Sequence, residues 1–209
     1  MPVIALWLGF ALLQQQSATA RYFPSPAELP ATPCSAPSDR FVPPADKGAV
    51  SEFENSWYSR HLAAAKESSL YRQARGRSPA ATLRFTWLPT FTHPVVVRVE
   101  WNAGRHGRLV AKQLSGAGGY DPGTIARTID RSLTAGEAAK IKALLARTRF
   151  FALPVTACDR GLDGSEWLFE RTDRAGYSLV KRWSPERGPA RQLGETLLGL
   201  TGWKFSEIY

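Results

Sequence analysis

The clearest alternation of apolar and polar residues along the chain lies between Gly161 and Pro185. A glycine-containing turn leads into a run rich in aromatic residues, which is followed by the turn sequence Asp173-Arg174-Ala175-Gly176 and a second alternating run. This order predicts a β-hairpin. Paired across that turn, the two runs place Trp167, Phe169 and Val180 on one face and Leu168 and Leu179 on the other.

Three earlier runs, at 82–87, 95–101 and 108–115, alternate with the two-residue period of a half-buried strand. They predict an antiparallel meander of three strands, or of four if the short β-like run over 124–131 joins it. The glycines at 116–119 are followed by Tyr120 rather than by the Lys-Ser or Lys-Thr of a phosphate loop. We therefore interpret this stretch as a connection between strands.

Two capping boxes mark the starts of helices, because a Ser or Thr stands three residues before a Glu at 51–54 and at 134–137. The apolar spacing that follows predicts helices over 52–66 and 135–148. A third helix is expected from Pro189, which suits a first helical position, to Gly202, which suits a helix end. The expected fold class is α+β: an antiparallel sheet, made of the meander and the C-terminal hairpin, with three helices packed on one face.

The sequence divides into three parts of different composition. Residues 1–20 contain no Lys, Arg, Asp or Glu, and hold an apolar run from Val3 to Leu13 followed by Ala18-Thr19-Ala20. This is typical of a cleavable signal peptide, although no Lys or Arg precedes the apolar run, and a buried N-terminal helix is the alternative. Residues 21–48 form a proline-rich arm or linker, and 49–209 form a single α+β domain. The predicted location is periplasmic or secreted, with no transmembrane span in the mature chain.

The chain carries a net charge of +9, from 27 basic and 18 acidic residues. A basic protein in the envelope is attracted to anionic surfaces. An envelope protein or an anionic surface is therefore the expected partner, and nucleic acid is not. The alternative, an arginine- and alanine-rich composition without functional meaning, is favoured because the basic residues are scattered. The oligomeric state does not follow from the sequence.

Cys34 and Cys158 are the only cysteines, and in an exported protein they are expected to form a disulfide. Neither lies in a recognisable nucleophile motif. The three histidines, His61, His93 and His106, have no metal-ligand spacing. The sequence thus predicts neither a metal site nor a cofactor.

Asp163, Glu166 and Glu170 gather at the start of the hairpin and are the weak candidates for acid–base catalysis. Glu166 and Glu170 share a strand face but stand roughly 13–14 Å apart along it, too far to act as a pair. Asp163 between glycines is more typical of a turn. Basic residues of the hairpin at 171, 181 and 182 are expected to pair with the two glutamates across the sheet. Arg182 and Trp183, before Ser184-Pro185, are the candidates for a binding surface.

The C-terminal third also resembles a family of uncharacterised bacterial proteins that are often exported. The resemblance covers 150–202, and its most specific elements are the Leu162-Asp163-Gly164 turn, Trp167, Glu170 and Arg182-Trp183-Ser184-Pro185. The family has no assigned activity, so the resemblance implies an exported protein and the hairpin-plus-helix arrangement but no catalytic residue.

These patterns favour an exported, non-enzymatic binding or interaction module. A small hydrolase that acts on cell-envelope material is the alternative, with Asp163, Glu166 and Glu170 as its only candidate residues.

Overall fold

The computed structural model describes residues 21–29, 48–76, 81–101, 107–157, 161 and 163–209. The predicted signal peptide, most of the proline-rich arm and both cysteines lie outside these residues. The predicted disulfide therefore stays a prediction.

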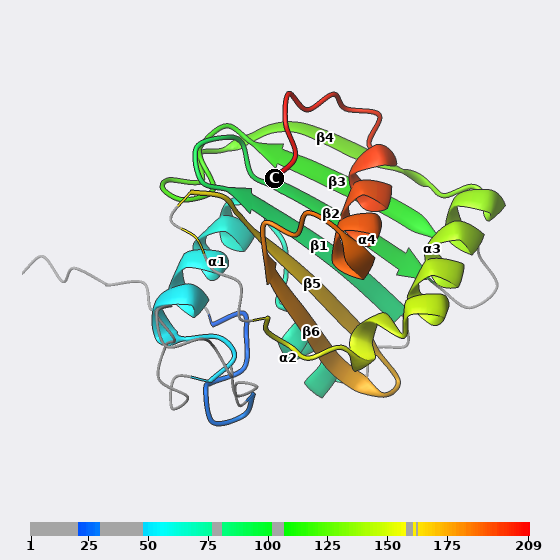
Figure 1. Ribbon diagram of the computed structural model, residues 1–209, viewed down its shortest axis with the longest axis horizontal. Helices are drawn as coiled ribbons and strands as arrows, with labels where there is room; N and C mark the ends of the chain where they lie inside the picture. Colours follow the sequence, from blue (N-terminus) through cyan, green and yellow to red (C-terminus); the bar gives the residue numbers. More distant parts are fainter. Residues whose placement is uncertain (1–20, 30–47, 77–80, 102–106, 158–160, 162) are drawn as a thin grey trace, which may run out of the picture.

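The described chain is built on one six-stranded antiparallel sheet with the strand order β4-β3-β2-β1-β5-β6 (Figure 1). The strands β1 to β4 follow one another as the predicted meander, and the predicted hairpin of β5 and β6 joins it by pairing β5 with β1. The strands are β1 (Ala81–Pro89), β2 (Val95–Trp101), β3 (Arg108–Leu114), β4 (Ile125–Ser132), β5 (Ser165–Asp173) and β6 (Gly176–Trp183).

Among the residues that the structure describes, four α-helices, rather than the expected three, pack on this sheet: α1 (Glu52–Ala64), α2 (Leu70–Arg75), α3 (Ala135–Thr148) and α4 (Gly188–Gly199). A 3-10 turn, η2 (Phe150–Ala152), follows α3. The expectation that all helices share one face is wrong. In Figure 1, α3 and α4 lie in front of the sheet and α2 lies behind it. Residues of α1 also pack on the rear face, with side chains such as Tyr58 and Leu62.

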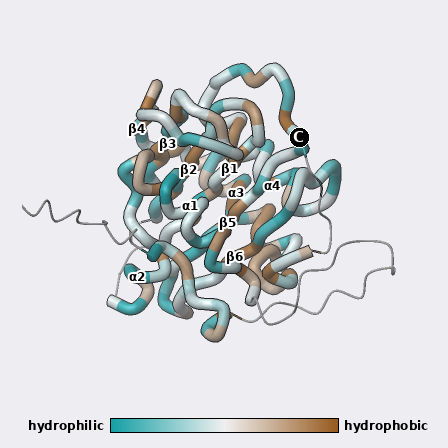
Figure 2. Tube along the Cα trace, turned by 90° about the vertical axis from the view of Figure 1, so that its left-hand side faces the viewer, coloured by the Kyte–Doolittle hydropathy of each residue, from teal (hydrophilic) through white to brown (hydrophobic). Residues whose placement is uncertain are grey.

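Each face of the sheet has its own hydrophobic core. The front core joins the odd-numbered residues of β1, such as Phe85, to α3 and α4. The rear core joins residues such as Leu88, Val96 and Leu168 to α1 and to the segment before it. Figure 2 shows the apolar residues, in brown, along the strands between these layers. The strand β1 is therefore buried on both faces, whereas its alternation had predicted a half-buried strand.

Local sequence signals account for most helix starts. Both predicted capping boxes are present, with Ser51 and Thr134 accepting a hydrogen bond from the backbone of Glu54 and Glu137. The helix α3 spans 135–148 as predicted. The helix α2 was not expected, because arginines and a glycine fill 72–77; it forms because Ser69 caps it.

The described part of the proline-rich segment, residues 21–29, packs on α1 and α2. Phe23 is fully buried in the rear core and meets the ring of Tyr58 edge to face. Asn55 donates a hydrogen bond to the carbonyl of Phe23, and Ser69 donates one to the carbonyl of Tyr22. This stretch is thus part of the packed domain, although it precedes residue 49.

Candidate functional site

Three connections meet at one end of the sheet, where β1 ends and β5 begins. The amide of Gly118, between β3 and β4, donates to the carbonyls of Pro89 and Thr92 at 2.9 and 3.0 Å. The amide and the hydroxyl of Thr90 both donate to the carbonyl of Gly164 at 2.8 Å. These bonds hold the β1–β2 loop, the β3–β4 loop and the segment before β5 together as one surface.

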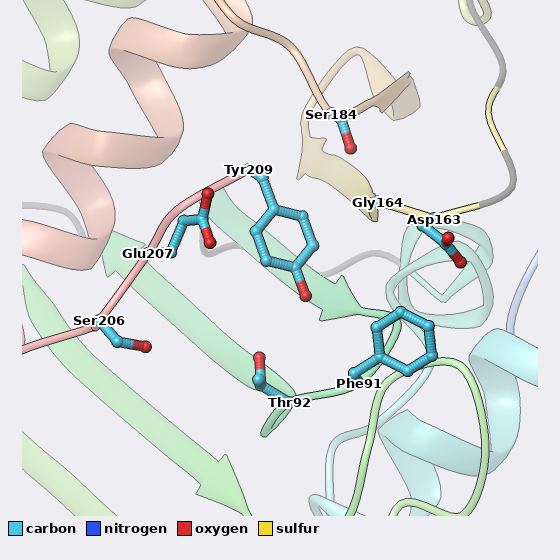
Figure 3. Close-up of a pocket in the computed structure, with 8 residues that line it drawn as sticks. All are labelled: Phe91, Thr92, Asp163, Gly164, Ser184, Ser206, Glu207 and Tyr209. Atoms are coloured by element: carbon cyan, nitrogen blue, oxygen red, sulfur yellow. The ribbon is translucent and has the colours of Figure 1, made fainter.

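A pocket of about 450 Å³ opens on this surface (Figure 3). The loops contribute one side of its lining and the C-terminal segment contributes the other. In Figure 3 the ring of Tyr209 lies in the middle of the group, with Asp163 on one side and Glu207 on the other. The lining residues are Phe91, Thr92, Asp163, Gly164, Ser184, Ser206, Glu207 and Tyr209.

Aromatic side chains continue from this pocket across the loops. Phe91 is 58% exposed, and its ring lies 6.3 Å from that of Tyr120, which is 61% exposed. Among the described residues these two and Phe53 are the large hydrophobic side chains that remain exposed. The two adjacent exposed rings extend the apolar surface beside the pocket.

The backbone under Asp163 is fixed by close packing. Ser184 continues the β5–β6 pairing: its amide donates to the carbonyl of Ser165, and its hydroxyl accepts from the amide of Ser165, both at 2.8 Å. Ser184 has a φ of 37°, in the left-handed region that residues with a side chain rarely adopt. A Cβ on Gly164 would lie 2.4 Å from the Ser184 hydroxyl. Only glycine therefore allows this approach without a shift.

Arg182 and Trp183, the predicted binding residues, do not line this pocket. The guanidinium of Arg182 donates to the carbonyls of Pro154 and Val155 at 3.0 and 3.2 Å. The indole of Trp183 lies so close to Gly161 that an added Cβ would stand 2.7 Å from its Nε1. Trp183 therefore packs beside the segment that holds Asp163, whereas Arg182 attaches the backbone at 154–155 to β6.

The C-terminal wall of the pocket is attached to the front core. The main-chain oxygen of Tyr209 accepts hydrogen bonds from the indoles of Trp167 and Trp87, at 2.9 and 3.4 Å, and from the hydroxyl of Ser165. The ring of Phe205 packs edge to face on Trp87. These contacts hold Ser206, Glu207 and Tyr209 against the loops.

Glu170 lies away from this pocket, in an ionic cluster under α2 on the rear face. The guanidinium of Arg84 donates to the carboxylate of Glu170 at 2.7 Å and to the carbonyl of Ser68 at 2.6 Å. The hydroxyl of Tyr177 also donates to Glu170 at 3.0 Å. Burial raises the pKa of Glu170, an effect that Arg84 opposes, and burial together with Glu170 raises the pKa of Tyr177.

Glu67 extends this cluster toward β2 and β3. Its carboxylate accepts from Arg98 at 2.8 Å and from Lys112 at 2.6 Å. The amine of Lys112 also donates to the carbonyl of Ala65 at 2.7 Å. The cluster therefore attaches the α1–α2 connection to the sheet.

Glu166 faces the rear side as well, near Tyr58 of α1. Burial, with the negative charges of Glu166 and Glu54, raises the pKa of Tyr58 well above its usual value. Burial raises the pKa of Glu54, but its ion pair with Lys181 more than offsets this and lowers it. The structure therefore separates Asp163 from Glu166 and Glu170. Glu170 forms its ion pair with Arg84 of β1, and Lys181 forms its ion pair with Glu54 of α1. The sequence had instead predicted pairs across the hairpin.

The histidines are dispersed. The ring of His61 lies between the carbonyls of Trp57 and Ala117, at 3.0 and 3.4 Å, and burial lowers its pKa. His93 contacts the carbonyl of Gly116, and His106 lies outside the described residues. Within the described chain no group of three or more His, Cys, Asp or Glu side chains could hold a metal ion. None of the helices in that same part of the chain is long and apolar enough to cross a membrane.

Comparison with protein-family models and with curated proteins found no match for this chain. The resemblance of 150–202 to an exported bacterial family therefore stays a prediction. Of the residues that line the pocket, the sequence had indicated Asp163, Gly164 and Ser184. It missed Phe91, Glu207 and Tyr209, because four segments far apart in the sequence build the pocket and no local pattern joins them.

Proposed function

We propose that this protein is an exported, non-enzymatic binding module whose pocket beside β1 and β5 takes a glycan of the cell envelope. The observation that carries the proposal is the lining of that pocket. It combines two exposed carboxylates, hydroxyl groups and two aromatic rings in about 450 Å³. This volume is within the range of small-ligand sites.

The lining fits a polyhydroxylated ligand. The carboxylates of Asp163 and Glu207 accept hydrogen bonds, and the hydroxyls of Thr92, Ser184 and Ser206 can both donate and accept. The rings of Phe91 and Tyr209 offer apolar surface for the C–H faces of a sugar ring. The carboxylates could also bind a cation. However, a chain with a net charge of +9 repels cations over distance, and this repulsion does not act on a neutral sugar.

Binding is favoured over hydrolysis by the surroundings of the two carboxylates. A general acid in a glycosidase needs an environment that keeps its carboxyl partly out of water. Asp163 and Glu207 are both exposed, and the buried carboxylates Glu166 and Glu170 lie on the other side of the sheet. A hydrolase acting on envelope material remains an outcome that the experiment below can reveal.

Export supports an envelope ligand. The leader-like composition of residues 1–20 and the net positive charge favour a periplasmic or secreted protein near anionic envelope surfaces. N-terminal sequencing of the protein recovered from the periplasm or medium tests this part, with a mature end near Arg21 expected. A mature chain that still begins at Met1 would contradict it.

The glycan proposal is tested by calorimetric titration of the mature protein with chitotetraose and with soluble peptidoglycan fragments. We expect binding that weakens tenfold or more in D163N and in E207Q. The matched control is E186Q, which removes an exposed carboxylate outside the pocket. Chromatography of the recovered sugar then separates the two functions: intact sugar supports a binding module, and shortened sugar supports a hydrolase. Absence of binding to every glycan would overturn the proposal.

A further inference from the structure

A second pocket, of about 520 Å³, lies on the front of the molecule between α3, η2 and β5. Its apolar surface comes from Leu145, Phe150 and Phe151. Arg171, which lines it, is seven residues along the chain from Gly164, so the two pockets are separated by roughly 23 Å of strand. The second pocket is therefore independent of the glycan site.

The charged side chains that line this second pocket are all basic: Lys142, Arg149 and Arg171. Arg171 is held in place, with its guanidinium 4.7 Å from the centre of the Phe151 ring and a hydrogen bond of 3.2 Å to the hydroxyl of Ser178. It also pairs with Asp173 at 3.2 Å, which neutralises part of its charge. The net charge of the lining with Asp173 included is still positive.

Lys142 and Arg149 carry the remaining charge. Within the part of the chain that the structure describes, neither forms an ion pair with a carboxylate. A cation at a helix C-terminus stabilises the helix, and this explains Arg149, which caps α3. Lys142 lies farther back in the helix, with its amine 6.0 Å from the centre of the Trp101 ring, and the helix terminus does not explain its charge. Arg171 comes from another element.

We propose that this pocket binds the headgroup of an acidic phospholipid. The phosphate would meet the three cations, of which Arg149 and Arg171 offer the planar donor arrangement that suits phosphate oxygens. The start of the acyl chains would lie on Leu145 and Phe151. An apolar surface beside unpaired cations is what a ligand with an anionic end and an apolar end requires, and neither a free anion nor a neutral lipid satisfies both parts.

The experiment titrates the protein with dihexanoyl phosphatidylglycerol below its micelle concentration, followed by calorimetry or by NMR shifts. We expect the Kd to rise tenfold or more in K142Q and in R149Q. The control R147Q removes an exposed arginine of the same helix that does not line the pocket, and should change the Kd less than twofold. Circular dichroism of each variant checks that it is folded.

Two other probes test which chemical features of the ligand are required. Dihexanoyl phosphatidylcholine should bind at least tenfold more weakly, because it carries no net negative charge. Inorganic phosphate should bind at least tenfold more weakly, because it cannot use the apolar surface. Equal binding of phosphatidylcholine, equal binding of inorganic phosphate, or an equal loss in R147Q would each overturn the proposal.

Discussion

Arg84 and Glu170 face each other across β1 and β5, and neither side chain is exposed to solvent. Their pairing joins the meander to the hairpin through side chains as well as through backbone hydrogen bonds. Because both charges are buried, removing one leaves the other without compensation. This pair is therefore where the rear of the sheet is most sensitive to substitution.

We expect E170Q or R84M to lower the free energy of unfolding by about 3–5 kcal/mol, the range for breaking a buried ion pair. Urea denaturation measures the change. The double variant R84M/E170L removes both charges and should recover much of the loss. The control E195Q breaks a partly exposed pair on α4 and should change stability by less than about 0.5 kcal/mol. A double variant less stable than either single one would contradict this account of the pair.

The close approach of Gly164 to Ser184 and Trp183 predicts that G164A disturbs the pocket. An added Cβ at 2.4 Å from the Ser184 hydroxyl requires a backbone shift and should cost about 1–3 kcal/mol, as overpacking does. Ligand affinity should fall with it, since Asp163 moves. In G199A, at the end of α4, the added Cβ meets nothing within 4 Å, so stability should stay the same or rise. Thermal unfolding of both variants provides the comparison, and equal midpoints would contradict it.

Burial of His61 predicts a pH dependence of stability. Its pKa is lower in the folded protein than the usual 6.5, mainly because of burial. The carbonyls of Trp57 and Ala117 oppose this effect, because both can accept a hydrogen bond only from the protonated ring. At pH values between the pKa of His61 in the folded protein and about 6.5, the unfolded chain binds more protons than the folded chain. The free energy of unfolding therefore falls as the pH drops below about 6.5. NMR titration should show His61 ionising below that value. In H61Q the slope of stability between pH 7 and 5 should flatten, and an unchanged slope would contradict the assignment.

The attachment of the C-terminal wall predicts coupled losses of stability and binding. F205A removes the ring that packs on Trp87 and should destabilise the protein by about 2 kcal/mol, at the low end for a large apolar truncation because Phe205 is only half-buried. The affinity for glycan should fall as well, because Ser206, Glu207 and Tyr209 line the pocket. The control K204A changes an exposed neighbour and should affect neither. A destabilised F205A that retained full affinity would show that this wall does not contribute to binding.

Local pattern predicted the elements that depend on neighbouring residues. Capping boxes identified the starts of α1 and α3. Alternation identified the hairpin and the face that Phe169 shares with Val180, which the structure pairs directly. Such signals succeed because hydrogen bonds and apolar spacing within a few residues decide them.

The arrangement of these elements did not follow from the same signals. Thr82, Arg84 and Thr86 indicated a solvent-facing side of β1, yet that side is buried because Glu170 pairs with Arg84 and the segment around Glu67 covers it. The pairing of β5 with β1 joins residues far apart in the sequence: Arg84 and Glu170 are separated by 86 positions. Periodicity carries no information at that separation, so the rear layer and the composition of the pocket were both missed.

Binding of a glycan in the pocket between the loops and the C-terminal segment is tested most directly by amide NMR spectra recorded during titration with chitotetraose or a peptidoglycan fragment. We expect the largest shifts at Thr92, Gly164 and Glu207, smaller shifts at Tyr120, and none near Arg149. Shifts confined to other surfaces, or no shifts with any glycan, would contradict it.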